Sequence, residues 1–350
     1  MSDYRKWFNI QAFGLNPDST NIGWNAHAAK EYALPEELRP TAWTGDRAVE
    51  LIRGYTSEQP LFLKVSFARP HSPYDPPKRF VDLYKDKKIL APVVGNWVKQ
   101  LEVSTDPEEN PEAAIGNFGV AYAQNSRKYY YAAITFIDEQ IGRIIDELKS
   151  KDMYDNALIC FVSDHGDMLG DHYLWRKTYA YEGSAAIPFI VKLPKDTPCK
   201  LKEGEEVDVP VELRDLLPTF LVINGMEIPK DMDGLSLLEP MQKEKYSWRK
   251  YIDIEHAATY WDNNYWCALT DGKIKYVWYF RSGEEQLFDL SKDPYELQNL
   301  AEKKSSQKSL EATKQAMAEH LAERGEGWVK NGKLVVREKS LLYSPNYPKD

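Results

Sequence analysis

The stretch FVSDHGDMLGDHYLWRK, residues 161–177, carries a dense set of side chains that could do chemistry. It holds three aspartates, two histidines and two cationic residues directly after an apolar run. Carboxylate oxygens suit hard cations such as calcium or magnesium, and a neighbouring imidazole is compatible with such a site. Asp164 and His165 are therefore a candidate metal-binding pair, and the alternative is a simple turn, which also favours Asp and Gly.

Two further residues could meet an anion near this pair. Lys177 carries a compact charge that would neutralise a transferring group, and its plain alternative is a solvated surface lysine. His71 lies in RPHSPYDPP, residues 69–77, where four prolines exclude helix and central strand and would hold the ring in place. The alternative for His71 is a loop histidine with a structural role.

Other histidines and aromatic residues are weaker candidates for substrate binding. His172 follows Asp171 as a second acid–imidazole pair, and His256 lies in DIEHA at an expected strand end, but a structural role is favoured for both. Four aromatic residues could stack on a sugar or aryl group, although packing is their commoner role: Trp97, Trp175, Tyr260 and Trp261.

Short apolar runs precede both polar loops. PLFLKVSFA, residues 60–68, leads into the His71 loop, and ALICFVSD, residues 157–164, leads into the acidic loop. With IPFIVKLP, residues 187–194, they predict three buried strands. Ligands of α/β sheets bind beyond the carboxyl ends of strands, so both loops could reach one rim of the sheet.

Helical patterns alternate with these runs. LRPTAWTGDRAVELIRGY is typical of an amphipathic helix capped by Thr44, and an isoleucine-rich face marks a helix from about Ser126 to Lys149. In VELRDLLPTFLVINGM, Pro218 indicates a helix start or a kink. Residues 91–120 look like an irregular connection. The alternation predicts an α/β fold in which helices cover a sheet.

The composition and pattern of the sequence change from about Tyr246. Aromatic-rich short strands follow, with Asp271-Gly272 as a hairpin turn, and SLEATKQAMAEHLAERGEG has helical spacing of apolar residues. We predict an α/β domain over residues 1–244 and a smaller C-terminal α+β subdomain, of short antiparallel strands plus a helix, over residues 245–350.

Composition narrows the class of protein. The chain of 350 residues is 43% hydrophobic and 28% charged, as in globular proteins, and its formal charge of −9 disfavours nucleic-acid binding. The three cysteines form no CxxC pair, so neither a zinc knuckle nor a disulfide framework is indicated. No stretch approaches the roughly 20 apolar residues of a membrane span, and MSDYRKWFNI lacks the apolar core of a signal peptide. We expect no nucleic-acid or membrane partner, and the compartment stays open.

Three segments together resemble one family. SDHGDMLGDHYLWRKTYAYEGSAAIPFIVKLP resembles the central signature of type I sulfatases, in the alkaline phosphatase superfamily. FARPHSPYDPPKRF resembles their histidine loop, and LFDLSKDPYELQNLA resembles a segment of their C-terminal subdomain. The resemblance covers most of the chain from Arg39 to Ala301, with the segments in the family's order.

The resemblance implies a fold, a reaction and a set of roles. The fold would be a sulfatase/alkaline-phosphatase-like mixed sheet sandwiched by helices. The reaction would be hydrolysis of sulfuric esters of small molecules or glycans, with a formylglycine nucleophile and a bound calcium ion, or magnesium in its place. By matching positions, Asp164 and His165 would be calcium ligands, while Lys177 and His71 would contact the sulfate group. Family members are often exported.

The sequence also departs from the family pattern. It contains no Asp-Asp pair, no Cys/Ser-x-Pro-Ser/Ala-Arg nucleophile motif and no Gly-Lys-Trp-His element. Because every missing motif belongs to the N-terminal part of the family, we expect an N-terminally truncated fragment that binds metal weakly and does not turn over sulfate esters alone. Its incomplete sheet would leave an apolar edge, which a complementing N-terminal fragment or self-association would cover.

Two alternatives to a sulfatase stay open. One is a phosphomonoester or phosphonate hydrolase of the same superfamily, because phosphate and sulfate groups are similar in shape. The other is a non-catalytic protein that binds an anion or a sulfated ligand. The absent nucleophile motif favours the second of these, while the retained set of His71, Asp164, His165 and Lys177 argues against it.

Overall fold

The computed structural model describes residues 2–98, 104–257, 259–260 and 264–337. Its helices are α1 Asp3–Gln11, α2 Pro40–Gly54, α3 Lys78–Asp82, α4 Val120–Ser150, α5 Glu182–Ala185, α6 Leu216–Ile223, α7 Leu238–Gln242 and α8 Gln307–Leu321. Short 3-10 turns lie at η1 Glu36–Leu38, η2 Asp171–Tyr173, η3 Leu213–Asp215, η4 Lys304–Ser306 and η5 Ala322–Arg324. The strands are β1 Ile159–Val162, β2 Phe189–Lys192, β3 Ile252–His256, β4 Trp266–Thr270, β5 Ile274–Tyr279, β6 Glu284–Asp289, β7 Val329–Lys330 and β8 Lys333–Leu334.

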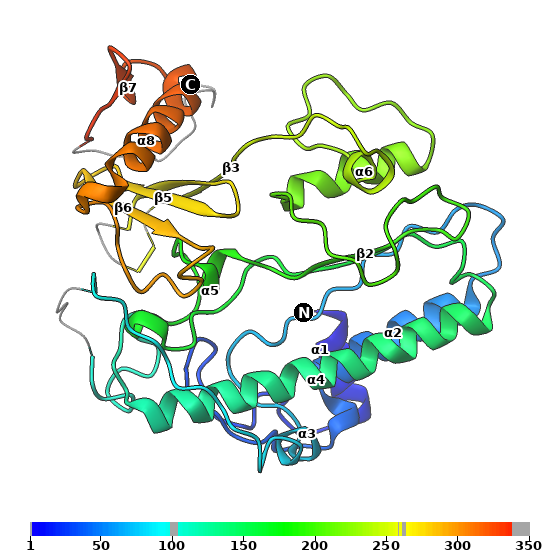
Figure 1. The fold of residues 1–350 in the computed structure, drawn as a ribbon. Coiled ribbons are helices and arrows are strands. Elements are labelled where there is room, and N and C mark those ends of the chain that lie inside the picture. The colour runs from blue at the N-terminus through cyan, green and yellow to red at the C-terminus, as the bar shows by residue number, and fades with distance from the viewer. Residues whose placement is uncertain (1, 99–103, 258, 261–263, 338–350) are drawn as a thin grey trace, which may run out of the picture.

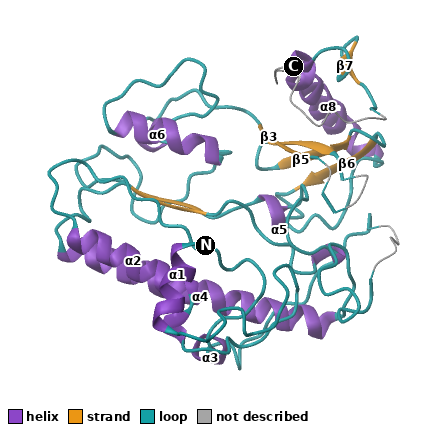
Figure 2. Ribbon diagram, turned by 180° about the vertical axis from the view of Figure 1, so that it is seen from behind, coloured by secondary structure: helices purple, strands orange, loops and turns teal. Residues whose placement is uncertain are grey.

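The β1–β2 ladder lies between two layers of helices. Figures 1 and 2 show α2 and α4 on one side of it and α6 on the other. Helices α2, α3 and α4 share one apolar cluster, which is built from Ala42, Phe80, Val81, Ala132 and Phe136. The arrangement of helices around strands is the one predicted from the alternating patterns.

Helix α4 is longer than the sequence pattern predicts. It begins at Val120, directly after Gly119 with φ of 84°, and runs to Ser150. The residues that it buries best include Ala132, Ala133 and Phe136. The isoleucine spacing correctly predicted a helix here, and on that face Ile134 remains 43% exposed.

Helices α2 and α6 each carry a proline in the first turn. Helix α2 begins at Pro40, after Arg39, and so the prediction of Thr44 as its cap is wrong. A proline in the first turn lacks only an N–H that would have no partner inside the helix. Pro218 likewise lies in the first turn of α6, which confirms that it marks a helix start.

The three predicted strands do not form one buried sheet. Strands β1 and β2 exist and pair antiparallel, with Cys160 opposite Val191, but Phe161 and Ile190 are 38% and 62% exposed. Residues 60–68 form no strand, and Phe62 is 78% exposed while its ring touches Phe220 of α6 at 5.9 Å. An apolar run becomes a strand only when a neighbouring backbone pairs with it. Among the described residues none pairs with residues 60–68, so that prediction is wrong.

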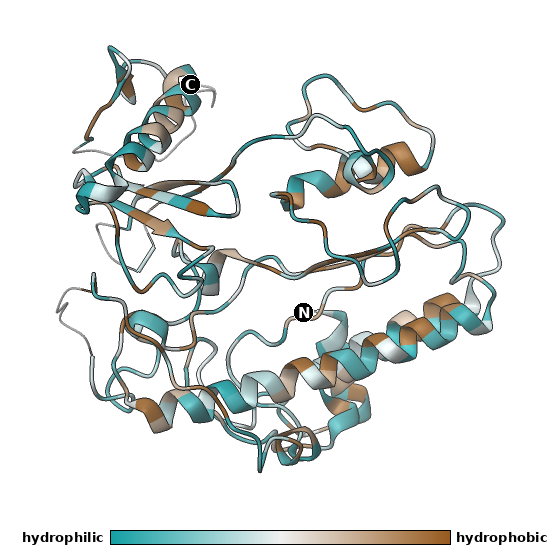
Figure 3. Ribbon diagram, in the orientation of Figure 1, coloured by the Kyte–Doolittle hydropathy of each residue, from teal (hydrophilic) through white to brown (hydrophobic). Residues whose placement is uncertain are grey.

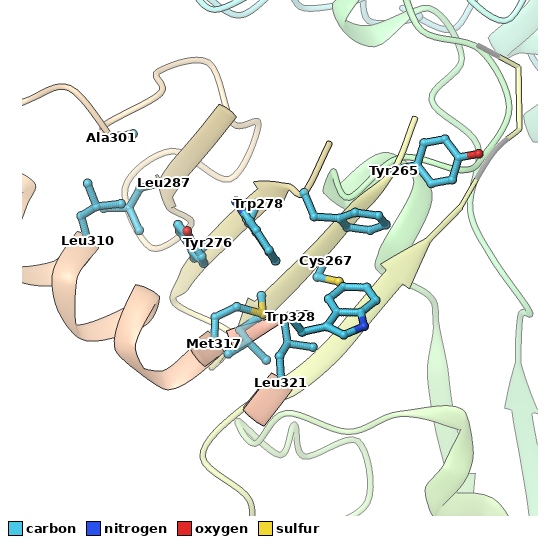
Figure 4. Packing of buried hydrophobic residues seen from close by; sticks show 12 residues of the cluster. Tyr265, Cys267, Tyr276, Trp278, Leu287, Ala301, Leu310, Met317, Leu321 and Trp328 are labelled. Atoms are coloured by element: carbon cyan, nitrogen blue, oxygen red, sulfur yellow. The ribbon is translucent and has the colours of Figure 1, made fainter. Parts of the chain in front are cut away.

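The C-terminal part forms a four-stranded antiparallel sheet in the order β3-β4-β5-β6. The predicted turn between β4 and β5 is confirmed: Gly272 has φ of 85°, and Asp271 Oδ1 accepts the N–H groups of Lys273 and Ile274 at 2.9 and 2.7 Å. Helix α8 packs on one face of this sheet. Figure 4 shows Met317 and Leu321 of α8 against Tyr276, Trp278 and Leu287 of the strands.

Some apolar residues of the α/β part are exposed to solvent and not packed in a core. Figure 3 shows apolar stretches along α4, α6 and the β1–β2 ladder. Several of these residues are exposed, among them Leu51, Ile134, Ile190, Leu217 and Val222. No helix in the described part of the chain is long and apolar enough to cross a bilayer.

Candidate functional site

His71 projects from a loop that prolines and a buried ion pair hold in place. The peptide bonds Arg69–Pro70 and Ser72–Pro73 are both cis. His71 Nδ1 lies 2.8 Å from the carbonyl oxygen of Ser72. Because a carbonyl only accepts, Nδ1 carries the proton, and in the neutral ring Nε2 then offers a lone pair.

A cluster of charges lies behind this loop. The Asp75 carboxylate, 3% exposed, accepts hydrogen bonds from both terminal nitrogens of Arg39, one of them at 2.8 Å, and from Arg69 Nε at 3.2 Å. Two guanidinium groups therefore share one carboxylate, which leaves one positive charge in excess. In a chain with a formal charge of −9, this excess makes the loop locally favourable for an anion.

The acidic loop presents Asp164 and His165 at the end of β1. His165 Nδ1 donates to the carbonyl oxygen of Gly166 at 2.8 Å, and its Nε2 lies 3.7 Å from Asp164 Oδ2. The Asp164 side chain is 85% exposed. A Cβ on Gly166 would lie 2.3 Å from the carbonyl oxygen of Gly183, so only glycine fits this close crossing of two chain segments.

Asp167, which sequence reasoning did not single out, joins the two loops. Its carboxylate accepts hydrogen bonds at 3.0 Å from the Tyr74 hydroxyl and from the N–H groups of Leu169 and Arg176. Burial raises the pKa of Asp167 in spite of these three donors. The only sequence signal was its place in SDHGD, and its partner Tyr74 lies 93 residues away along the chain.

Lys177 is held in an unusual stretch of backbone. Its neighbours Arg176 and Thr178 have φ of 67° and 86°, a region that non-glycine residues seldom occupy. The C-terminal sheet secures this stretch, because Asn264 Nδ2 donates to Thr178 Oγ1 and Trp266 Nε1 donates to the Thr178 carbonyl oxygen, both at 3.1 Å. The sheet therefore sets the position of Lys177.

The structure brings His71, Lys177 and His165 together. Lys177 Nζ lies 2.8 Å from His71 Nε2, although the residues are 106 positions apart. The rings of His71 and His165 meet edge to face with centroids 6.3 Å apart, and Asp164 adjoins His165. Burial and the Lys177 charge lower the pKa of His71, while burial and Arg176 lower the pKa of Lys177. A neutral His71 whose Nε2 accepts a hydrogen bond from Lys177 Nζ–H fits these distances.

The other two predicted histidines lie elsewhere. His172 is 3% exposed, its Nδ1 accepts the N–H of Gly95 at 3.0 Å, and its ring lies 4.8 Å from that of Trp97. His256 ends β3, with its ring 6.0 Å from that of Trp266. Within the described residues, no hydrogen bond or ring contact joins either histidine to His71 or Lys177.

Two of the four predicted aromatic residues are packing residues, and an aromatic residue outside the motifs lies beside His71. Trp175 is 1% exposed, and Trp97 stacks on Tyr181 at 4.5 Å. The Tyr260 ring covers the Arg176 guanidinium at 4.5 Å, and Trp261 lies outside the described residues. Trp24, which carried no motif, stacks on the His71 ring at 5.5 Å.

Asp164 and His165 would supply part of a metal site. With Nδ1 protonated, His165 Nε2 has its lone pair on the side of the Asp164 carboxylate, as a ligand would need. Calcium takes six to eight oxygen ligands. In the described part of the chain, no group of three or more His, Cys, Asp or Glu residues could hold a metal ion. These two donors alone therefore do not fit a calcium site.

Comparisons with known proteins bear on the whole chain. A family model described as "Sulfatase" matches residues 13–226, and one described as "N-sulphoglucosamine sulphohydrolase, C-terminal" matches residues 170–323. An arylsulfatase of Clostridium perfringens is 37% identical over 339 residues, which cover 95% of this chain and 68% of that protein. A third of that relative thus has no counterpart in the match.

Solved structures resemble the fold. The phosphonate monoester hydrolase of Agrobacterium radiobacter matches with a TM-score of 0.75 and 21% identity, over 92% of this chain and 69% of that one. The protein BT4656 was solved with its substrate D-glucosamine-2-N,6-O-disulfate. It matches with a TM-score of 0.64 and 20% identity, and the match covers 83% of this chain and 70% of that one. The predicted α/β fold of the sulfatase and alkaline phosphatase type is thereby confirmed.

Proposed function

The chain belongs to the sulfatase family, and from this premise we propose that it supplies the sulfate-binding part of a sulfuric ester hydrolase site. The observation that carries the proposal is the 2.8 Å contact between Lys177 Nζ and His71 Nε2, which joins two loops far apart in the sequence. Lys177 would turn its Nζ–H groups to the sulfate oxygens, and His71 would do the same with Nε2 once that nitrogen is protonated. The Arg39–Asp75–Arg69 cluster adds one positive charge behind them.

His71 has a second role in this proposal. Cleavage of a sulfate ester leaves an alcohol oxygen that must take up a proton. Burial and the Lys177 charge keep the pKa of His71 low in the absence of an anion, and a bound sulfate would raise that pKa again. Nε2 would then carry a proton close to the ester oxygen while Nδ1 stays bonded to the Ser72 carbonyl.

The test is calorimetric titration of the full chain with inorganic sulfate. We expect Lys177→Met to lower the affinity at least tenfold. The matched control is Lys195→Met, because Lys195 is a surface lysine with 73% side-chain exposure and an ion pair to Asp155 at 3.4 Å. Equal affinities of the Lys177 variant and the control would refute the assignment.

The finer substrate is part of the same proposal. The relatives act on an aryl sulfate ester by name, or are solved with a sulfated sugar. We propose that this chain takes sulfated small molecules or glycans. A phosphonate or phosphate monoester is the second candidate, favoured by the fold match to the phosphonate monoester hydrolase. Tighter binding of phenylphosphonate than of phenyl sulfate would favour that second candidate.

We also propose that turnover needs a further polypeptide segment. The 350 residues contain no formylglycine-type motif, and β1 pairs on one edge only among the described residues. The ladder itself carries two exposed apolar side chains, Phe161 and Ile190, which lie opposite each other. An apolar strand adding to the β1 edge would pair the free backbone groups of β1 and lie beside Phe161.

The partner proposed is a segment like the part of the C. perfringens arylsulfatase that has no match in this chain. Mixing that segment with the full chain should form a complex and restore hydrolysis of an aryl sulfate. Phe161→Lys, at a position on β1 that is 38% exposed, should abolish the complex and leave sulfate binding intact. Dimers of this chain alone would favour self-association instead, and sulfate binding without turnover in the mixture would favour a non-catalytic binding protein.

The same added segment would also complete a metal site. We propose that Asp164 and His165 provide two ligands for calcium or magnesium and that the remaining donors come from the added segment. The chain alone should therefore bind Ca²⁺ weakly, and the complex should bind it more tightly in a manner that Asp164→Asn removes. Tight Ca²⁺ binding by the chain alone, measured by calorimetry, would contradict this part of the proposal.

A further inference from the structure

Trp24 lies beside the anion site without belonging to either of its loops. Its ring stacks on the His71 ring with centroids 5.5 Å apart and planes inclined by 28°. Ser72 Oγ donates to the Trp24 carbonyl oxygen at 3.2 Å, so the main chain is also tied to the loop that carries His71. The position of the indole relative to His71 is therefore defined by both side chain and backbone.

The indole is nonetheless open to solvent. Trp24 is 61% exposed, whereas Trp175, which also stacks on a histidine, is 1% exposed. A ring exposed to this extent leaves apolar surface that a bound planar group would remove from water. With His71 against one part of the ring, a second planar group still has an accessible indole surface to contact.

The geometry points to Trp24 as the platform for the organic group of the sulfate ester, which makes it a specificity-determining residue for ring-bearing substrates. The inference rests on the proposed function, because it needs the sulfate group at His71 and Lys177. A ring linked to that sulfate through one oxygen lies within reach of an indole that stacks directly on the imidazole. Stacking on the indole would add affinity that a small alkyl sulfate cannot obtain.

Charge around Trp24 restricts the organic group further. The Arg69 guanidinium lies 5.6 Å from the centre of the Trp24 ring. It shares Asp75 with Arg39, so the neighbourhood keeps an excess positive charge. A cationic group on the indole would meet that charge, and therefore neutral or anionic rings, such as aryl groups and sulfated sugars, are favoured over quaternary ammonium groups.

The experiment compares phenyl sulfate with methyl sulfate, which carry the same charge and differ in the ring. Calorimetric titration of the full chain should show a roughly two- to tenfold preference for phenyl sulfate. Trp24→Ala should remove this preference and leave the affinity for methyl sulfate within about twofold of its original value. Trp24→Phe should keep part of it. The control Phe13→Ala, at an aromatic residue 94% exposed, should change neither affinity.

Each other result has a distinct meaning. Equal losses for both esters in Trp24→Ala would show that Trp24 only positions His71, and an unchanged preference would place the organic group on another surface. Either result overturns this inference and leaves the proposed function standing. Tighter binding of choline sulfate than of phenyl sulfate would overturn the restriction on charge. If the unaltered chain binds neither methyl nor inorganic sulfate, the proposed function fails and this inference falls with it.

Discussion

Replacement of Lys275 should show how much its buried ion pairs contribute to the stability of the protein. Lys275 in β5 has a fully buried side chain, and its Nζ contacts Glu296 at 2.8 Å, Glu182 at 2.6 Å and the carbonyl oxygen of Ala180 at 2.8 Å. Glu296, 1% exposed at its side chain, also accepts the N–H of Glu182 at 2.7 Å. These bonds fix residues 180–182, directly after the stretch that carries Lys177.

Lys275→Met removes the cation and leaves a buried carboxylate without its counter-ion. Breaking a buried ion pair from one side typically costs about 3–5 kcal/mol, and the Ala180 carbonyl loses its donor as well, so we expect a loss of about 4 kcal/mol in the free energy of unfolding at pH 7. Burial already raises the pKa of Glu296, and without Lys275 that pKa rises further. Protonation of Glu296 then relieves the penalty, so the deficit should shrink between pH 7 and pH 5.

Urea unfolding followed by tryptophan fluorescence measures this cost. Lys292→Met is the matched control, because Lys292 is 81% exposed at its side chain and pairs with Asp289 on the surface, where a pair contributes about 0–1 kcal/mol. The double replacement Lys275→Met with Glu296→Gln should recover much of the loss. A cost below about 1 kcal/mol for Lys275→Met, or a deficit that does not change with pH, would refute the reasoning.

Three further predictions concern protonation and backbone packing. Because a bound sulfate raises the pKa of His71, which lies below 6.5 in the unliganded protein, sulfate affinity should rise as the pH falls from 8 towards 5.5, and calorimetry should detect proton uptake on binding; an affinity that is constant over this range would contradict the prediction. Burial lowers the pKa of His27 to about 4 from 6.5, so its contribution to stability is complete above pH 6.5 and is lost as the pH falls towards 4, by up to about 3 kcal/mol. His27→Gln should flatten the stability–pH curve in that window, and an unaltered slope would count against it. Gly166→Ala, whose Cβ would meet the Gly183 carbonyl oxygen at 2.3 Å, should cost about 2 kcal/mol or more, whereas Gly142→Ala in α4, where nothing lies within 4 Å, should stabilise the protein by up to about 1 kcal/mol. Chemical denaturation of both variants checks this, and similar values for the two would contradict it.

The local signals in the sequence predicted the elements that depend on local physics. The isoleucine spacing predicted α4, the Asp271-Gly272 pair predicted the β4–β5 turn, and Pro218 predicted the start of α6. These features need no information from distant parts of the chain, because backbone geometry and side-chain periodicity decide them.

The predictions that were wrong needed information from a neighbour. Residues 60–68 have the composition of a buried strand, yet strand formation depends on a paired backbone, and none pairs with them among the described residues. Their apolar side chains, and those of β1 and β2, also stay partly exposed because the facing layers do not close on them. The composition of a segment indicates which secondary structure it favours, but it does not show whether another segment lies beside it and pairs with it.

In the candidate site, too, local motifs predicted some residues, while others became apparent only from contacts between distant segments. His71 and Lys177 stood out because proline and acidic motifs surround them in the sequence. Asp167 and Trp24 did not, because their significance comes from contacts with Tyr74 and His71 that lie 93 and 47 positions away. A motif search finds residues whose type and spacing are constrained by the reaction. An aromatic residue that stacks on a ligand can come from many positions in a chain, so no motif marks it.

The parts of the site differ in what holds them. Contacts within this chain hold the residues proposed to bind the anion: the Arg39–Asp75–Arg69 cluster backs His71, and Asn264, Trp266 and Lys275 secure the stretch around Lys177. Asp164 is held less firmly, since its side chain is 85% exposed and accepts the N–H of His165 at 3.1 Å, and the described residues supply too few donors around it for a metal ion. Binding of a sulfate group should therefore persist in this chain alone, while metal binding should depend on an added segment. The two properties can be measured separately, and a chain that binds calcium tightly but not sulfate would reverse this assignment of roles.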